Sequence, residues 1–338
     1  MQRIKIVDYL KAIFILLVII THAEVIPVEN LINPLVIDQA VPGFMILSGY
    51  MFAFSSSGKK MKEMYHKNKL IKKVYRFIIP AIISYFVYLV GWHLQGSYQL
   101  TMKDIVYRFI MGLYGPGGYY CGIMLQFILV APIVWEIIRR FNKNGILAIT
   151  ALNLMFEIMV RVWMIDESIY RVLIFRYLLL IAAGMYLYLN IKSHTCFQYL
   201  VVSWILGALY LVLPYLTTYE YRLFTLWSST SMMTTLYIYP IMYFILKQFE
   251  LLYIENLAGQ IFEEIGKASY HIMYTQMIYY VGVKNILYGV INLQIYGGFV
   301  EIVFAIVVSV ISGYIFYELD NFLLRPLLRY KKRGKNEA

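Results

Sequence analysis

Residues 7–25, VDYLKAIFILLVIITHAEV, are the stretch of sequence that decides the fold. The run is about as long as a helix must be to cross a bilayer, yet it contains Asp8, Lys11 and His22. At about 100° per helical residue, Lys11 and His22 lie about 20° apart, and Asp8 lies about 60° to the other side of Lys11. One helix face therefore carries all three groups, as expected for a substrate pathway or an active-site lining inside a membrane.

These three side chains also have a simpler interpretation. Asp8 and Lys11 are three residues apart and can form an ion pair whose lysine reaches the lipid headgroups, while His22 lies at the far interface. The position of His22 on the same face as the pair favours the functional interpretation.

The composition is that of an integral membrane protein. Of 338 residues, 61% are hydrophobic and 14% are charged, and the mean hydropathy is +0.66. A soluble domain has about 25% charged residues. Apolar runs predict an all-α, polytopic bundle in which residues 1–330 form one domain and 331–338 form a basic cytoplasmic tail. The ten predicted transmembrane helices lie near residues 7–25, 35–55, 76–95, 120–138, 145–162, 171–189, 197–216, 226–247, 269–288 and 299–322.

The distribution of basic residues predicts the orientation of this bundle. With the N-terminus in the cytoplasm, 22 of the 30 lysines and arginines lie on the cytoplasmic side, seven lie outside and Lys11 lies in the membrane. We therefore expect both termini to be cytoplasmic in a multi-pass protein of the plasma membrane, in contact with lipid. The net charge of +11 then reflects topology and does not indicate a nucleic-acid partner.

The most basic segment, residues 55–76, reads SSSGKKMKEMYHKNKLIKKVYR. Most of its lysines fit a cytoplasmic anchor against anionic lipid. Lys72, Lys73 and Arg76 differ because they begin the third helix, with residues 72 and 76 one turn apart. We expect them to direct positive charge into the inner mouth of the bundle, where they suit a polyphosphorylated ligand.

Three further polar residues lie within or beside predicted spans. Ser48, in the run PGFMILSGYMF, permits close helix packing or a local break that lines a cavity. Tyr119 and Tyr120 follow a Gly/Pro turn at the outer end of the fourth helix. They fit either an interfacial aromatic belt or a substrate-binding position.

Other candidates are expected near the outer face and in the ninth helix. Arg176 begins the sixth helix from outside, whereas Glu157 and Arg161 are one turn apart and are expected to pair. His271 lies in the polar start of the ninth helix, where a packing role competes with a direct one. Cys121 and Cys196 are expected on opposite sides, and the sequence has no metal-ligand spacing.

Together these segments resemble the acyltransferase 3 family of bacterial membrane proteins, which modify cell-surface glycans. The resemblance covers most of the chain and rests on the acidic, basic and histidine positions of the first helix, a Phe/Ser-Gly segment, the basic start of the third helix and a late glutamate: Asp8, Lys11, His22, Phe44, Ser48, Gly49, Lys72, Lys73, Arg76 and Glu318. The sequence departs from the family pattern at Gln276, where a second histidine is common, and at Lys11, Lys72 and Lys73, where arginine is common.

The resemblance implies an enzyme, an O-acyltransferase that moves an acetyl or other short acyl group from cytoplasmic acyl-CoA to a hydroxyl of a surface polysaccharide or its lipid-linked precursor. We expect His22 to be the general base, with Asp8 and Lys11 organising the donor channel. Lys72, Lys73, Arg76 and Ser48 are expected to bind the donor, and Tyr119, Tyr120 and Arg176 the acceptor.

No tightly bound cofactor is expected, because acetyl-CoA or another acyl-CoA serves as co-substrate. One alternative is a polytopic transporter of a glycan or small molecule that uses the intramembrane Asp, Lys and His as substrate or proton ligands. Another is a non-catalytic partner of an export system. The absence of an inverted repeat weighs against the transporter.

Overall fold

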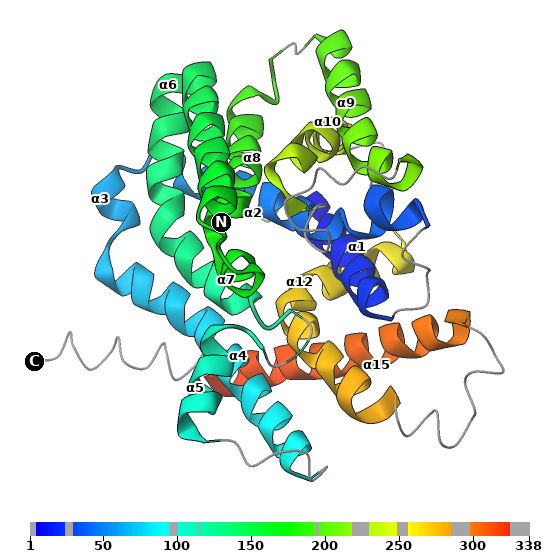
Figure 1. Ribbon diagram of the computed structural model, residues 1–338. Helices are drawn as coiled ribbons and strands as arrows, with labels where there is room; N and C mark the ends of the chain where they lie inside the picture. Colours follow the sequence, from blue (N-terminus) through cyan, green and yellow to red (C-terminus); the bar gives the residue numbers. More distant parts are fainter. Residues whose placement is uncertain are drawn as a thin grey trace, which may run out of the picture.

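The computed structural model describes residues 5–23, 30–94, 101–113, 115, 117–193, 196–217, 230–248, 256–284 and 298–324. These residues form helices joined by turns and short connections, with no strands among them (Figure 1). Five helices among them are long and apolar enough to cross a membrane: Asn33–Ser56, Lys67–Gly91, Tyr120–Val162, Phe197–Leu216 and Gly298–Leu323. The predicted tail at 331–338 lies outside the described residues.

The N-terminal half comprises α1 (Lys5–His22), η1 (Asn33–Ile37), α2 (Ala40–Ser56), α3 (Met61–Met64), α4 (Lys67–Leu94), α5 (Met102–Ile110) and α6 (Tyr120–Val162). The C-terminal half comprises α7 (Glu167–Val172), η2 (Ile174–Tyr177), α8 (Leu178–Asn190), α9 (Phe197–Leu216), η4 (Met232–Thr234), α10 (Thr235–Lys247), α12 (Leu257–Met277), η5 (Ile278–Val283), α15 (Gly298–Leu319) and η6 (Asp320–Leu324). Each of the ten predicted ranges contains helix in its described part.

Four predicted spans fall outside the set of long apolar helices because they are too short or too rich in charged residues. The helix α1 has 18 residues and includes Lys5, Asp8 and Lys11. The helices α8 and α10 have 13 residues each. The helix α12 has 21 residues, and its first half carries Glu263, Glu264 and Lys267. Charge therefore excludes α1 and α12 from this set, whereas length excludes α8 and α10.

The long helix α6 contains the fourth and fifth predicted spans, joined at a sharp reversal. Asn142 has φ 44° and ψ −111°, which no α-helix contains. A Cβ atom built on Gly145 would lie 2.8 Å from the carbonyl oxygen of Ile137, eight residues earlier. In a straight helix these residues would be about 12 Å apart along the axis. The chain therefore turns back on itself, as the two separate sequence ranges predicted.

Two close helix contacts organise the core. The helices α2 and α8 pack so tightly that a Cβ on Gly184 would lie 1.9 Å from the Ile46 carbonyl oxygen. The helix α1 packs along α12, and a Cβ on Gly266 would lie 1.9 Å from the Asp8 carbonyl oxygen. Small residues permit this approach of backbones in membrane bundles. As Figure 1 shows, α1 thereby lies among α2, α12 and α15.

Candidate functional site

A cavity of about 610 Å³ opens at one end of the bundle, where α1, α2, α4, α6 and α12 converge. We call it the basic cavity. Seven of its lining residues are cationic and one, Glu63, is acidic. The cations are Lys11, Lys59, Lys69, Lys72, Lys73, Arg76 and Lys267. Such a surplus of positive charge in a confined space favours a ligand with several negative charges.

The start of α4 supplies four of these cations: Lys69, Lys72, Lys73 and Arg76. Lys72 and Arg76 are one helical turn apart, and Lys73 lies between them, with its ammonium 5.2 Å from the ring centre of Phe52 on α2. Lys72 and Arg76 are exposed, so their charged groups can meet a ligand from solvent. The structure thus places Lys72, Lys73 and Arg76 together at the mouth of the bundle.

The rest of the lining of the basic cavity comes largely from α1, α2, α6 and α12. Lys11 lies there with Ser48, and its ammonium is 3.7 Å from the Asp8 carboxylate. Asp8 is nearly fully buried, whereas a third of the Lys11 side chain is exposed. Tyr270 donates a hydrogen bond of 2.7 Å to the Phe77 carbonyl, which joins α12 to α4. The Lys11 ammonium and the hydroxyl groups of Ser48 and Tyr270 therefore line the same cavity.

His22 is not among the residues that line this cavity. It lies at the other end of α1, half-buried, with its ring centre 6.2 Å from that of Tyr280 in an edge-to-face arrangement. The Tyr280 hydroxyl donates a hydrogen bond of 2.6 Å to the Ile19 carbonyl and so fixes this ring against α1. Between Lys11 and His22, Ile15 is fully buried on the shared face.

Arg176 and Tyr119 lie in a second cluster, which we call the Arg/Tyr cluster: Tyr119, Glu157, Tyr170, Arg171, Arg176 and Tyr177. Arg176 is fully buried, and its guanidinium carbon lies 4.2, 5.4 and 5.9 Å from the ring centres of Tyr177, Tyr170 and Tyr119. It also donates a hydrogen bond to the Tyr177 hydroxyl. Cation–π contacts of this kind stabilise a charge that is removed from water.

The predicted pairing of Glu157 with Arg161 is wrong. The two residues are both described and form no ion pair, and Glu157 instead accepts a hydrogen bond of 3.0 Å from the Tyr170 hydroxyl. Tyr170 contacts Arg176 in turn. Glu157 thus belongs to the Arg/Tyr cluster, because α7 folds back toward the second arm of α6.

A break in the helical backbone positions Arg176. The chain leaves α7 at Leu173 and passes through the short 3₁₀ turn η2 before α8 begins. Gln126 of α6 bonds both sides of the break, donating to the Val172 carbonyl at 2.7 Å and accepting from the Ile174 amide at 3.1 Å. Asn153 accepts from the Leu179 amide at 2.9 Å. Such replacement partners are what permit a broken helix inside a membrane protein.

Tyr119 and Tyr120 are adjacent but serve different sites. Tyr119 precedes the first turn of α6 and faces the Arg/Tyr cluster, whereas Tyr120 lines the basic cavity near Ser48. Consecutive helical residues point about 100° apart, which explains the separation. His271 lies apart from both sites, buried, with Nε2 3.2 Å from the Asp320 carboxylate.

Four further polar residues that line the basic cavity were not singled out from the sequence. Lys59 and Lys69 belong to the basic segment that was interpreted as a cytoplasmic anchor. Lys267 and Tyr270 line the cavity from α12, and Lys267 pairs with Glu264. The only signal for Lys267 and Tyr270 was their spacing of three residues, which places them on one helix face.

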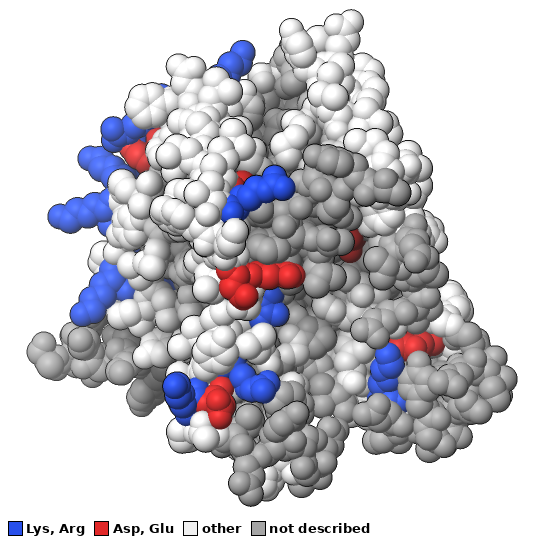
Figure 2. All heavy atoms as spheres, in the orientation of Figure 1, with Lys and Arg blue, Asp and Glu red and all other residues white. Residues whose placement is uncertain are grey.

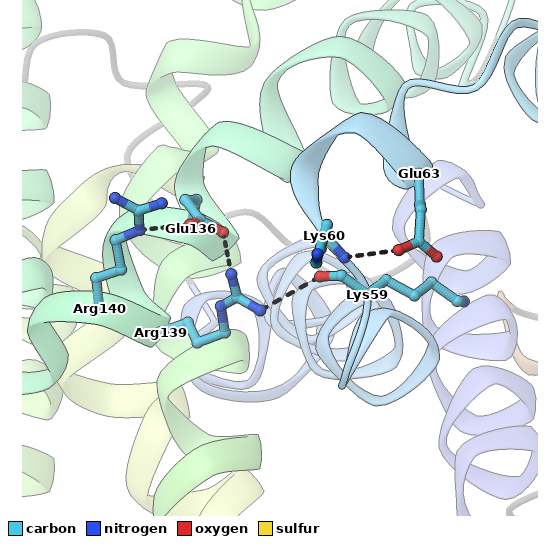
Figure 3. A network of polar contacts seen from close by, with 6 residues as sticks. All are labelled: Lys59, Lys60, Glu63, Glu136, Arg139 and Arg140. Atoms are coloured by element: carbon cyan, nitrogen blue, oxygen red, sulfur yellow. Dashed lines mark hydrogen bonds and ion pairs between the residues drawn. The ribbon is translucent and has the colours of Figure 1, made fainter.

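The mouth of the basic cavity is held by a network of polar contacts that Figure 3 shows. Glu136 of α6, which is buried, binds Arg139 at 2.6 Å and also binds Arg140. Arg139 donates a second hydrogen bond of 3.2 Å to the carbonyl of Lys59, in the connection between α2 and α3. The surface around this mouth is rich in Lys and Arg, which gather on the side of α3 and the start of α4 (Figure 2).

A family model described as an acyltransferase domain, that of the acyltransferase 3 family, matches residues 4–318. The chain belongs to this family. The match contains the basic cavity and the Arg/Tyr cluster, and together with the apolar helices it identifies the chain as a membrane acyltransferase. No curated protein and no solved structure matches the chain.

Proposed function

We propose that the protein is a multi-pass O-acyltransferase of the plasma membrane, with ten spans and both termini in the cytoplasm. It transfers an acetyl or other short acyl group from cytoplasmic acyl-CoA to a hydroxyl of a surface polysaccharide or its lipid-linked precursor. The observation that carries this proposal is the basic cavity, in which seven cations from separate segments surround one space.

The charge and shape of the cavity suit a CoA thioester. Arginine and lysine bind phosphate through charge-assisted hydrogen bonds, and arginine can do so with two nitrogens at once. Lys72 and Arg76 are exposed, whereas Lys11 and Ser48 are half-buried, so phosphates bound by the exposed cations would leave the pantetheine arm directed inward. Lys11 is held by Asp8, which fixes a charge where the arm enters the bundle.

The same helix that forms the inner wall carries the proposed base. His22 is eleven residues beyond Lys11, about 16 Å along the axis, which is of the order of an extended pantetheine arm. In the reaction His22 accepts the proton of the acceptor hydroxyl as its oxygen attacks the thioester carbonyl. The carbon–sulfur bond then breaks, and the CoA thiolate leaves and takes up a proton.

The acceptor would bind on the side of the Arg/Tyr cluster. Tyr119 is half-buried and so can offer an aromatic face, while Arg176 lies behind it, fully buried. Tyr120, which lines the basic cavity, would lie nearer the donor than the acceptor.

Mass spectrometry of envelope glycans, with and without the gene, tests this function. We expect O-acyl groups to disappear from one class of glycan and to return when the wild-type gene is restored. Unchanged glycan acylation, together with loss of an exported glycan, would favour the transporter instead.

A further inference from the structure

Part of the wall of the basic cavity at its mouth is the short connection between α2 and α4, which contains the one-turn helix α3. Lys59, Glu63 and Met64 line the cavity from residues 57–66, between α2 and α4. Gly58 turns the chain with φ 78°, and beyond its two chain neighbours no residue lies within 4 Å of the position that a Cβ would take there. Packing at Gly58 itself therefore does little to fix the connection, whose buried apolar contact comes from Met64 in α3.

Two side-chain contacts attach this connection to α6. Arg139 donates from Nη1 to the Lys59 carbonyl at 3.2 Å, and the Tyr65 hydroxyl donates to the Leu129 carbonyl at 2.5 Å. Arg139 is itself oriented by its ion pair with Glu136 at 2.6 Å. The guanidinium thus bridges a buried carboxylate and the backbone of the cavity wall, as Figure 3 shows. A planar group with two donor nitrogens suits this double contact.

Arg140 provides a natural comparison within the same network. It binds the same Glu136 carboxylate, but no contact in Figure 3 joins it to the connection, and 67% of its side chain is exposed, against 34% for Arg139. The two arginines therefore have nearly the same position along α6 and the same charge. They differ in whether they hold the cavity wall.

We propose that Arg139 is a positioning residue for donor binding, acting through the Lys59 backbone and not by touching the donor. Arg139 and Glu136 together form a clamp that keeps residues 57–66 against α6, so that Lys59 and the α4 cations surround one space before the ligand arrives. A wall fixed in advance lowers the ordering cost of binding. The inference rests on the proposed function in taking the cavity ligand to be acyl-CoA.

The test measures acetyl-CoA binding to the full-length protein in lipid nanodiscs, together with steady-state transfer. For Arg139→Ala we expect the donor dissociation constant to rise about fivefold or more, with turnover at saturating donor unchanged. Glu136→Gln, which keeps the side-chain size, is expected to act in the same direction. For Arg140→Ala we expect a change of less than about twofold, because exposed ion pairs contribute little.

Hydrogen–deuterium exchange supplies a readout that does not depend on the donor. We expect Arg139→Ala to speed exchange of the backbone amides in residues 57–66, Arg140→Ala to leave it unchanged, and saturating acetyl-CoA to slow it again in the variant. Equal donor constants for Arg139→Ala and Arg140→Ala would overturn the clamp while leaving the proposed function intact. Absence of acetyl-CoA binding by the wild type would overturn the proposed function and this inference with it.

Discussion

Lys11 and His22 lie on the same helix, α1, but only Lys11 lines the basic cavity, while His22 packs edge-to-face against Tyr280. This arrangement separates a charged end of the helix, open to a polyanionic ligand, from an end that carries a potential base. The buried residues between them form the interior of the bundle. The proposed reaction requires the pantetheine arm to extend along this helix, so that the acyl group reaches His22.

His22→Ala is expected to lower transfer at saturating donor by about a hundredfold or more, because a general base contributes about that much. Donor affinity should stay near the wild-type value, since His22 does not line the basic cavity. Thr21→Ala is the matched control, because Thr21 is the adjacent residue and is exposed. Turnover of His22→Ala equal to that of the control would exclude the general-base role. Steady-state kinetics measures turnover and the apparent donor affinity. Quantification of membrane-inserted protein shows whether each variant is present in the same amount.

Glu63→Gln should tighten donor binding. Glu63 is the one acidic residue among those that line the basic cavity, so its removal relieves repulsion of the phosphates. At the surface of a protein the gain is modest, and we expect about a twofold to fivefold lower dissociation constant. Titration of acetyl-CoA at low ionic strength measures it, and Glu318→Gln, at an exposed residue outside the cavity lining, should leave the constant unchanged. Weaker binding in Glu63→Gln would mean that this carboxylate contacts the donor favourably.

Gly266→Ala should destabilise the contact of α1 with α12. The added methyl group would lie 1.9 Å from the Asp8 carbonyl oxygen, so one backbone must move, at a cost of about 1–3 kcal/mol. Gly122→Ala is the control, since no atom lies within 4 Å of its Cβ position and a helical Gly-to-Ala change adds about 0.5–1 kcal/mol. Thermal unfolding in detergent compares the two. An unfolding midpoint of Gly266→Ala at or above that of the wild type would contradict the close contact.

The topology is tested by cysteine substitution at two exposed lysines on a background without native cysteines. An impermeant reagent applied to intact cells should modify Lys103→Cys and spare Lys62→Cys, because basic residues concentrate on the cytoplasmic side. The opposite labelling pattern would invert the bundle and exchange the donor and acceptor sides.

The approximate locations of the helices followed from sequence, because apolar runs and their interruptions are local properties. The break at Leu173 within the sixth predicted span and the start of α12 at Leu257 were not predicted. The separation of α6 at Asn142 matches the two predicted ranges, since its cause, a short polar turn, is visible in the sequence. The convergence of Lys72 and Arg76 was also predictable, as it needs only their spacing on one helix.

The sequence did not reveal which residues of different helices come together in space. Lys267 joins Arg76 in the basic cavity although 191 positions separate them, and nothing local distinguishes Lys267 from a topological charge. The sequence predicted that Glu157 pairs with Arg161 on the same helix, but α7 brings the Tyr170 hydroxyl within hydrogen-bonding distance of Glu157 instead. Contacts of this kind depend on how α6, α7 and α12 pack, which no periodicity reveals.

The most direct test of the account is the equilibrium binding of radiolabelled acetyl-CoA to the purified protein. We predict saturable binding to the wild type and an increase of about tenfold or more in the dissociation constant for Arg76→Ala, because a charge-assisted contact is worth about 1.5–3 kcal/mol. Lys62→Ala should change it little, since Lys62 lies in the same basic segment but does not line the cavity. Equal effects of the two substitutions, or no binding by the wild type, would contradict the assignment of the basic cavity to the acyl donor.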